Sequence, residues 1–320
     1  MVSFLVTAVL IAIPTYFYAW LVRSIDRFEK EPAPYLIAAF LWGALPAVIA
    51  GLILQLLFNI PVELLLGANS LGGQVITTAI TAPVTEELLK GAAVAIIYFQ
   101  RRREFDGWVD GLVYGATAGF GFAYVENILY IMGTESVEEW IALFFLRVII
   151  LGFMHGFWTA LTGIGFGLAR HLRNPFQRSL VIAGGLIAAI AGHLIHNGSL
   201  VLAQISEGAT ILITIANYCF LALLMMVLGF VAAINDRKLL KIYLKDEVPH
   251  ILSAESYEAL ISSRSNALAQ FHLSPKQKRA FIQIAAELAQ KKHQFLKMGE
   301  EEGNSAEIEQ LRLTLKQMSQ

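Results

Sequence analysis

Residues 74–98 read QVITTAITAPVTEELLKGAAVAIIY, an apolar stretch with three charged side chains, Glu86, Glu87 and Lys90, near its middle. A transmembrane helix needs roughly 20 mostly apolar residues, and this stretch is long enough to be one. Six similar stretches accompany it, at residues 4–22, 35–58, 109–132, 140–168, 180–203 and 211–234. The chain is therefore predicted to be all-α, a polytopic membrane helix bundle of about seven transmembrane helices.

The composition excludes the other broad classes of protein. Of the 320 residues, 56% are hydrophobic and 15% are charged, and the mean hydropathy is +0.60. A soluble domain carries about 25% charged residues, and a disordered chain is polar. The net charge of −1 provides no basic patch for a nucleic acid. The single Cys219 excludes a disulfide framework and a Cys-rich metal site. The expected partner is the lipid bilayer, and no nucleic acid is expected.

Positive charges alternate between the connecting segments. The segments after the first, third and fifth stretches contain Arg or Lys. Those after the second, fourth and sixth contain Glu but no Arg or Lys. Cytoplasmic loops carry an excess of Lys and Arg. The pattern predicts an N-terminus outside the cell, an uncleaved first helix and a cytoplasmic C-terminus. The expected location is a cell membrane that the chain crosses several times.

The composition changes after the seventh stretch. Residues 236–320 contain 13 of the 24 Lys and Arg residues and 11 of the 25 Asp and Glu residues. Their apolar residues recur at nearly helical spacing. Residues 1–235 are therefore predicted to form the transmembrane domain. Residues 236–320 are predicted to form a charged, helical, cytoplasmic tail that is solvated or binds a partner.

The stretch 109–132 contains glycines at helical spacing: Gly111, Gly115, Gly119 and Gly121. Glycines four residues apart allow helix backbones to approach closely in lipid. This stretch is predicted to pack tightly against a neighbouring helix.

Four consecutive stretches carry ionisable or amide side chains at membrane depth, where each charge costs roughly 2.5–3.5 kcal/mol on insertion scales. At a rise of about 1.5 Å per residue, most of them fall in one layer. They are Glu86, Glu87, Lys90, Glu126, Asn127, Arg147, His155, His193, His196 and Asn197. So costly a set predicts a functional site. Arg147 and His196 have simple structural alternatives, an outward-pointing or paired guanidinium and a packed imidazole.

Helical spacing limits the roles of these side chains. Glu86 and Lys90 are four residues apart and share a helix face. Glu86 and Glu87 point about 100° apart, so only one of them can face a reaction centre. His193 and Asn197 share a face. The spacing leaves open which glutamate is the catalytic one.

Together these groups contain the parts that hydrolysis requires. A carboxylate in an apolar site can take a proton from water and return it. Polar groups such as His193 and Asn197 can donate hydrogen bonds to a developing oxyanion.

The order of these motifs resembles the PrsW family of intramembrane proteases. The resemblance consists of Glu-Glu-x-x-Lys from Glu86, Phe-x-x-x-Glu-Asn from Phe122, the isolated His155, and His-x-x-x-Asn from His193. The segment 26–32, DRFEKEP, is also similar to a loop of that family. PrsW proteins resemble in turn the Abi and type II CAAX prenyl endopeptidases. Two differences from those relatives, Lys90 and Glu126, favour the PrsW branch.

The resemblance implies roles for individual residues. Glu86 and Glu87 form the catalytic pair, with one as the general base, and Glu126 orients the attacking water. His193 and Asn197 bind the oxyanion. His155 either contacts the water or donates to the transition state. Lys90 balances the charge of the pair, and Asn127 and Phe122 belong to the supporting motif.

A metal ion is an open alternative. Glu126, His155 and His193 could bind Zn²⁺, but the chain has no His-Glu-x-x-His motif. Relatives are described both as glutamate-type proteases and as metalloproteases. The glutamate-type mechanism without a cofactor is the favoured hypothesis.

The resemblance also implies a substrate, a membrane-anchored protein such as an anti-sigma-factor-like regulator. The alternative function is a proton- or ion-coupled transporter, since intramembrane Glu, His and Lys can relay protons and Pro83 could open its helix. A seven-helix receptor or scaffold would have no need for the charged cluster.

Overall fold

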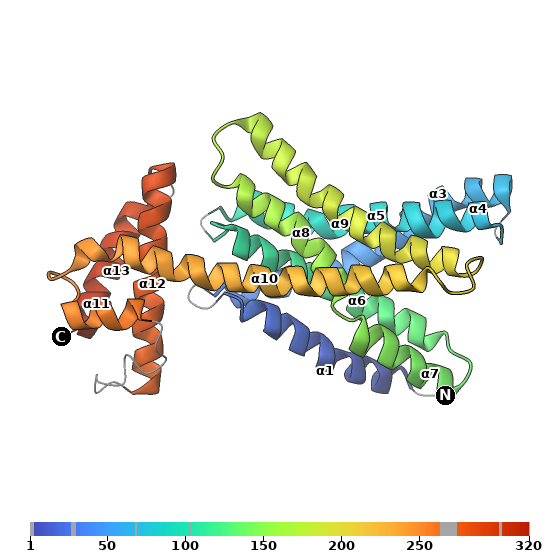
Figure 1. The fold of residues 1–320 in the computed structure, drawn as a ribbon, viewed down its shortest axis with the longest axis horizontal. Coiled ribbons are helices and arrows are strands. Elements are labelled where there is room, and N and C mark those ends of the chain that lie inside the picture. The colour runs from blue at the N-terminus through green and yellow to red at the C-terminus, as the bar shows by residue number, and fades with distance from the viewer. Residues whose placement is uncertain are drawn as a thin grey trace. The chain divides into compact units, whose positions relative to one another are not determined.

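The computed structural model describes residues 3–26, 30–67, 69–102, 104–262, 274–300 and 303–319. Within these ranges every regular element is a helix, as predicted (Figure 1). The chain divides into two compact units. One comprises residues 1–24 and 31–226, and the other comprises residues 25–30 and 227–320. The long helix α10 (Ile211–Tyr243) begins in the first unit and continues into the second.

The first unit begins with α1 (Phe4–Arg23) and a long interrupted helix. In the latter, α2 (Ala33–Trp42) continues through the π-helical segment η1 (Gly43–Ala47) into α3 (Val48–Leu66). Pro46 lies inside the π-segment. A proline lacks the backbone N–H of a regular helical turn, so the local register changes while the helix continues.

Residues 74–98 also lie within one interrupted helix. The short α4 (Leu71–Gln74) continues through the π-segment η2 (Val75–Thr81) into α5 (Ala82–Gln100). The N–H of Ala82 donates to the carbonyl of Thr77, five residues back. In this register the next N–H would reach Thr78, but residue 83 is a proline. The Thr78 carbonyl is thereby left for a partner from another helix.

The helix predicted over residues 140–168 is broken. The chain forms α7 (Val137–Leu143), the π-segment η3 (Phe144–Ile150) and then α8 (Met154–Ala169). The break exposes carbonyls, and the Tyr18 hydroxyl contacts two of them, those of Val148 and Ile149, at 2.9 and 3.0 Å. A buried hydroxyl from another helix thus stabilises the interruption directly before His155.

Helix α6 (Trp108–Met132) is the most enclosed long helix of the first unit, and α9 (Pro175–Ala203) follows α8. The predicted glycine face is confirmed. A Cβ atom on Gly111 or Gly119 would lie 2.0 or 2.2 Å from a backbone oxygen of α8, so only glycine permits this approach. Gly121 makes a similar approach to Phe40 of α2.

Five helical stretches in the described residues are long and apolar enough to cross a membrane: Phe4–Arg23, Ala33–Leu66, Val137–Ala169, Pro175–Ala203 and Ile211–Glu247. They correspond to five of the seven predicted spans. The other two, over residues 74–98 and 109–132, form helices but are less apolar. They carry charged residues and glycines that are buried within the protein.

The second unit has a hydrophobic core of its own. After α10 come the 3₁₀ turn η4 (Lys245–Glu247), α11 (Ala254–Ile261), α12 (Pro275–Met298) and α13 (Asn304–Ser319). Leu240, Leu252 and Phe281 are buried in this core. Glu247 is also buried and accepts from Lys292 at 2.5 Å and Arg312 at 2.7 Å. The predicted charged tail is thus helical and packs on itself.

Candidate functional site

Glu87 is fully enclosed within the polar cluster. It lies on α5 with its side chain fully buried. One carboxylate oxygen contacts Lys90 Nζ at 2.5 Å and His193 Nδ1 at 3.0 Å. The other oxygen accepts from the Thr159 hydroxyl at 2.9 Å. Three helices therefore hold this carboxylate in place.

Glu86 has a different environment one position earlier on α5. Its Oε1 accepts from Gln55 Nε2 of α3 at 3.0 Å. Its Oε2 is buried without a hydrogen-bond partner. It lies 3.9 Å from His193 Nε2 and 4.0 Å from Lys90 Nζ. Because adjacent helical residues point about 100° apart, Glu86 faces a cavity, whereas Glu87 points into the protein.

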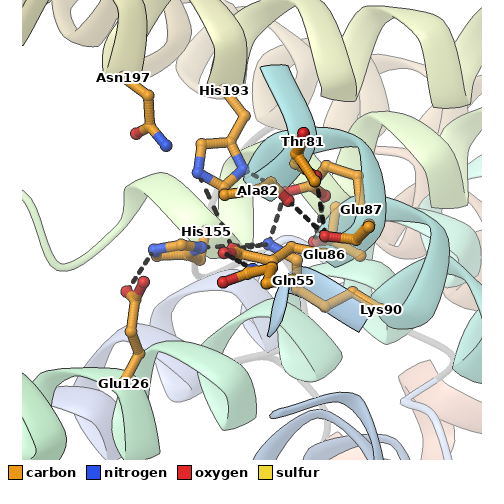
Figure 2. A network of polar contacts seen from close by, with 12 residues as sticks. Gln55, Thr81, Ala82, Glu86, Glu87, Lys90, Glu126, His155, His193 and Asn197 are labelled. Carbon is orange, nitrogen blue, oxygen red and sulfur yellow. Dashed lines mark hydrogen bonds and ion pairs between the residues drawn. The ribbon is translucent and has the colours of Figure 1, made fainter. Parts of the chain in front are cut away.

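His155 connects the two ends of the cluster (Figure 2). It stands in the first turn of α8, directly after the helix break. Its Nδ1 lies 3.1 Å from Lys90 Nζ, and its Nε2 lies 2.9 Å from Glu126 Oε2. Both ring nitrogens are therefore engaged by charged groups from α5 and α6.

Glu126 is shared between His155 and Arg147. The guanidinium of Arg147 contacts Glu126 Oε2 at 2.8 Å and Asn127 Oδ1 at 3.1 Å. It also lies over the ring of Tyr130, 3.8 Å from the centroid. Of the two structural alternatives for Arg147, an outward-pointing or a paired guanidinium, the structure shows the paired one.

His193 and Asn197 lie on one face of α9, as their spacing predicted, but they have different partners. The His193 ring stacks on Trp158 with centroids 4.0 Å apart. Asn197 Nδ2 donates to the Thr78 carbonyl at 3.0 Å, the oxygen that Pro83 leaves free. Figure 2 shows Asn197 beside His193, with no hydrogen bond to Glu86 or Glu87. Its oxyanion role stays a prediction.

A cavity of about 660 Å³ opens beside this cluster. Glu86, Glu126, His155 and His193 line it, whereas Glu87 and Lys90 stand behind its wall. The buried Phe122 also lines it and lies 4.6 Å beneath Lys90 Nζ. The structure thus brings together six residues that lie on four predicted spans: Glu86, Glu87, Lys90, Glu126, His155 and His193.

Three of these residues fit a metal ion. Among the described residues, one carboxylate oxygen of Glu86 and one ring nitrogen each of His155 and His193 lie within 4.8 Å of one another. Two histidines and a glutamate are a donor set typical of zinc. The unpartnered Oε2 of Glu86 also suits a ligand. For the case that a metal is bound, the sequence suggested Glu126 as the carboxylate ligand, but this set contains Glu86. Glu126 contacts Arg147 and His155 instead.

Several contributors to the site were not evident from the sequence. Thr159, Trp158 and Gln55 resemble ordinary helix residues, and each touches a motif residue only through tertiary packing. A polar residue at membrane depth is the one signal that marks Thr159 and Gln55. Trp158 has no such signal. His196 of α9 is buried, and its Nδ1 has no partner in the structure.

Comparison with known proteins identifies the family that this chain resembles. A profile described as "PrsW family intramembrane metalloprotease" matches residues 31–232. The second unit lies almost wholly beyond the matched region. No solved structure matches the chain.

Several curated relatives are named "Protease PrsW". The Geobacillus kaustophilus protein is 30% identical over 161 residues, which are 50% of this chain and 63% of the relative. The Bacillus subtilis protein is 29% identical over 161 residues, 50% of this chain and 65% of the relative. The Clostridioides difficile protein is 33% identical over 119 residues, 37% of this chain and 48% of the relative. The chain thus spans less than two thirds of each.

Proposed function

The chain belongs to the PrsW family of intramembrane metalloproteases, and from this we propose that it is an endopeptidase that hydrolyses peptide bonds of membrane-anchored proteins. The observation that carries the proposal is the buried, unpartnered oxygen of Glu86 at the wall of a large cavity. Such a carboxylate can accept a proton from a water molecule and hold it away from solvent.

In this mechanism Glu86 is the general base and Glu87 is a positioning residue. Glu86 Oε2 has no donor and lines the cavity, whereas both oxygens of Glu87 already accept hydrogen bonds. Water positioned against Glu86 attacks the carbonyl carbon of the scissile bond. Glu86 takes the proton and returns it to the nitrogen of the leaving amine.

The remaining residues prepare this step. Glu87 orients His193 through the 3.0 Å contact with Nδ1, which leaves Nε2 directed toward Glu86 and the cavity. Glu126 holds His155 in the same way through Nε2. Lys90 contacts both networks and offsets the negative charge of the paired glutamates. Asn197 would stabilise the oxyanion after exchanging its bond to Thr78.

A zinc ion would be held by Glu86, His155 and His193, and it would supply Lewis-acid activation of the water. The glutamate-type mechanism is supported by Lys90, whose ammonium group already lies 3.1 Å from His155 Nδ1 and 4.0 Å from Glu86 Oε2. An ammonium group in this position opposes a second cation at the same donors.

We further propose that α5 and α6 also cross the membrane, which gives seven spans. The alternating Arg and Lys residues of the connecting segments support an N-terminus outside the cell and a cytoplasmic second unit. The substrate class would be membrane-anchored regulators of the anti-sigma-factor type in a bacterial inner membrane.

The experiment compares Glu86→Gln, Glu87→Gln and the control Glu63→Gln in lipid bilayers with a panel of single-span bacterial regulators. Glu86→Gln is expected to lower kcat by about 10²–10⁴-fold without a change in unfolding temperature, since it removes only the base. Glu87→Gln is expected to lower both kcat and stability, because it weakens three contacts. Wild-type cleavage by Glu86→Gln would refute the assignment of the base.

A further inference from the structure

The cavity has a second wall, of which the proposed chemistry uses Asn197 alone. It is lined by the amide side chains of Gln55, Asn59, Gln74, Asn197 and Gln204. Amides within transmembrane helices are costly unless they find hydrogen-bond partners. Four of them already bond to Glu86, to the Thr78 carbonyl or to each other, whereas the oxygen of Asn59 has no partner. Five amides along one cavity, one of them unsatisfied, indicate a ligand with hydrogen-bonding groups.

On two helices the polar residues recur at helical spacing and start from the reaction centre. Along α9 and its C-cap they are His193, Asn197 and Gln204. Along the α4–α5 helix they are Gln74, Thr78 and Glu86, which are four and eight residues apart. Residues three or four apart share a helix face. The two rows meet at one end of the bundle, where Gln204 Nε2 donates to Gln74 Oε1 at 2.8 Å. Figure 1 shows α4 and the end of α9 at this same end.

Helix α3 supplies a third row. Gln55 binds Glu86, and Asn59 follows one turn later in the same cavity. The Oδ1 atom of Asn59 is buried and has no hydrogen-bond partner. An acceptor in this state requires a donor from a bound molecule or water.

The length of the rows identifies the ligand. The twelve residues from Gln74 to Glu86 span about 18 Å at 1.5 Å per residue. An extended peptide advances about 3.3 Å per residue, so about five residues cover this distance. A helical peptide satisfies its own backbone groups, whereas an extended one in an apolar medium needs partners for every N–H and C=O.

We propose that these amides form a subsite for about five residues of extended polypeptide backbone, beside the scissile bond. This inference rests on the proposed protease function. Because amides bind backbone groups rather than particular side chains, the site selects a substrate segment that unwinds and tolerates variation in its sequence. The Gln74–Gln204 end of the cavity receives the part of the segment farthest from the scissile bond.

The test measures binding, so that it is independent of cleavage. Two fluorescent single-span peptides are compared on the Glu86→Gln protein in lipid nanodiscs. Next to the outer end of the span, one peptide carries five Gly, Ser and Pro residues and the other carries five Ala and Leu residues. The amide variant combines Asn59→Leu, Gln74→Leu and Gln204→Leu, which removes both members of the Gln74–Gln204 pair together. The control is Gln100→Leu, an exposed glutamine at the end of α5 outside the cavity.

The Glu86→Gln protein and its Gln100→Leu derivative are expected to bind the Gly/Ser/Pro peptide about tenfold more tightly than the Ala/Leu peptide. The amide variant is expected to reduce this ratio to within twofold. If that variant does not fold, Asn59→Leu alone is expected to lower the ratio by about threefold. Absence of binding, equal binding of the two peptides, or an unchanged ratio in the folded variant would overturn the subsite. Preferential binding of a peptide that the wild type never cleaves would support the subsite and refute the endopeptidase.

Discussion

Replacing Gly119 by alanine is expected to separate α6 from α8 and displace His155. A Cβ atom at Gly119 would lie 2.2 Å from the His155 carbonyl oxygen and 2.8 Å from the Gly156 Cα, whereas ordinary contact begins at 3.4 Å. The helices must therefore move apart by about 1 Å at this point, since two rigid backbones meet there.

The magnitude follows from two opposing effects. Overpacking of this kind costs about 1–3 kcal/mol, and alanine recovers about 1 kcal/mol of helix propensity relative to glycine. The net loss of stability is expected to be at most about 2 kcal/mol, so the protein should still fold. His155 contacts Lys90 at 3.1 Å and Glu126 at 2.9 Å. A displacement of about 1 Å breaks both, and a misplacement of that size can cost about 10²-fold in rate.

The assay measures thermal unfolding and kcat of Gly119→Ala beside the control Gly184→Ala. Gly184 lies on α9, where an added Cβ meets no atom within 4 Å. The control is expected to keep the wild-type rate and stability. If Gly119→Ala retained a rate within twofold of Gly184→Ala, the close approach of α6 and α8 would not determine the geometry of the site.

Three further predictions concern the site and the second unit. Thr159→Val removes the donor to Glu87 and is expected to cost about 1.5–3 kcal/mol of stability and to lower kcat. Thr159→Ser should restore both, and equal behaviour of the two variants would refute a hydrogen-bonding role. Dialysis against a strong chelator is expected to leave kcat within twofold; a loss that Zn²⁺ reverses would instead establish Glu86, His155 and His193 as ligands. Glu247→Gln leaves Lys292 and Arg312 without their buried partner and is expected to destabilise the second unit by about 3 kcal/mol. Hydrogen exchange in α12 measures this effect, with the exposed Glu309→Gln as a control that should cost less than about 0.5 kcal/mol.

The sequence by itself determined the helical class and the membership of the polar cluster. Apolar stretches of sufficient length have few alternatives to membrane helices. The insertion cost of buried charges makes Glu86, Glu126, His155 and His193 conspicuous wherever they lie in space. The glycine face of α6 was predictable for a related reason, since a small residue every fourth position permits close packing.

Only the tertiary structure decided which glutamate faces the cavity. Spacing places Glu86 and Glu87 about 100° apart on the helix, but it does not determine how the helix is rotated against its neighbours. That rotation depends on contacts from distant segments, such as Thr159 to Glu87 and Gln55 to Glu86. The break before His155 was hidden for the same reason, because the hydroxyl of Tyr18 that stabilises it comes from another helix. Local patterns determine which residues are buried, whereas contacts between helices determine the direction in which each one points.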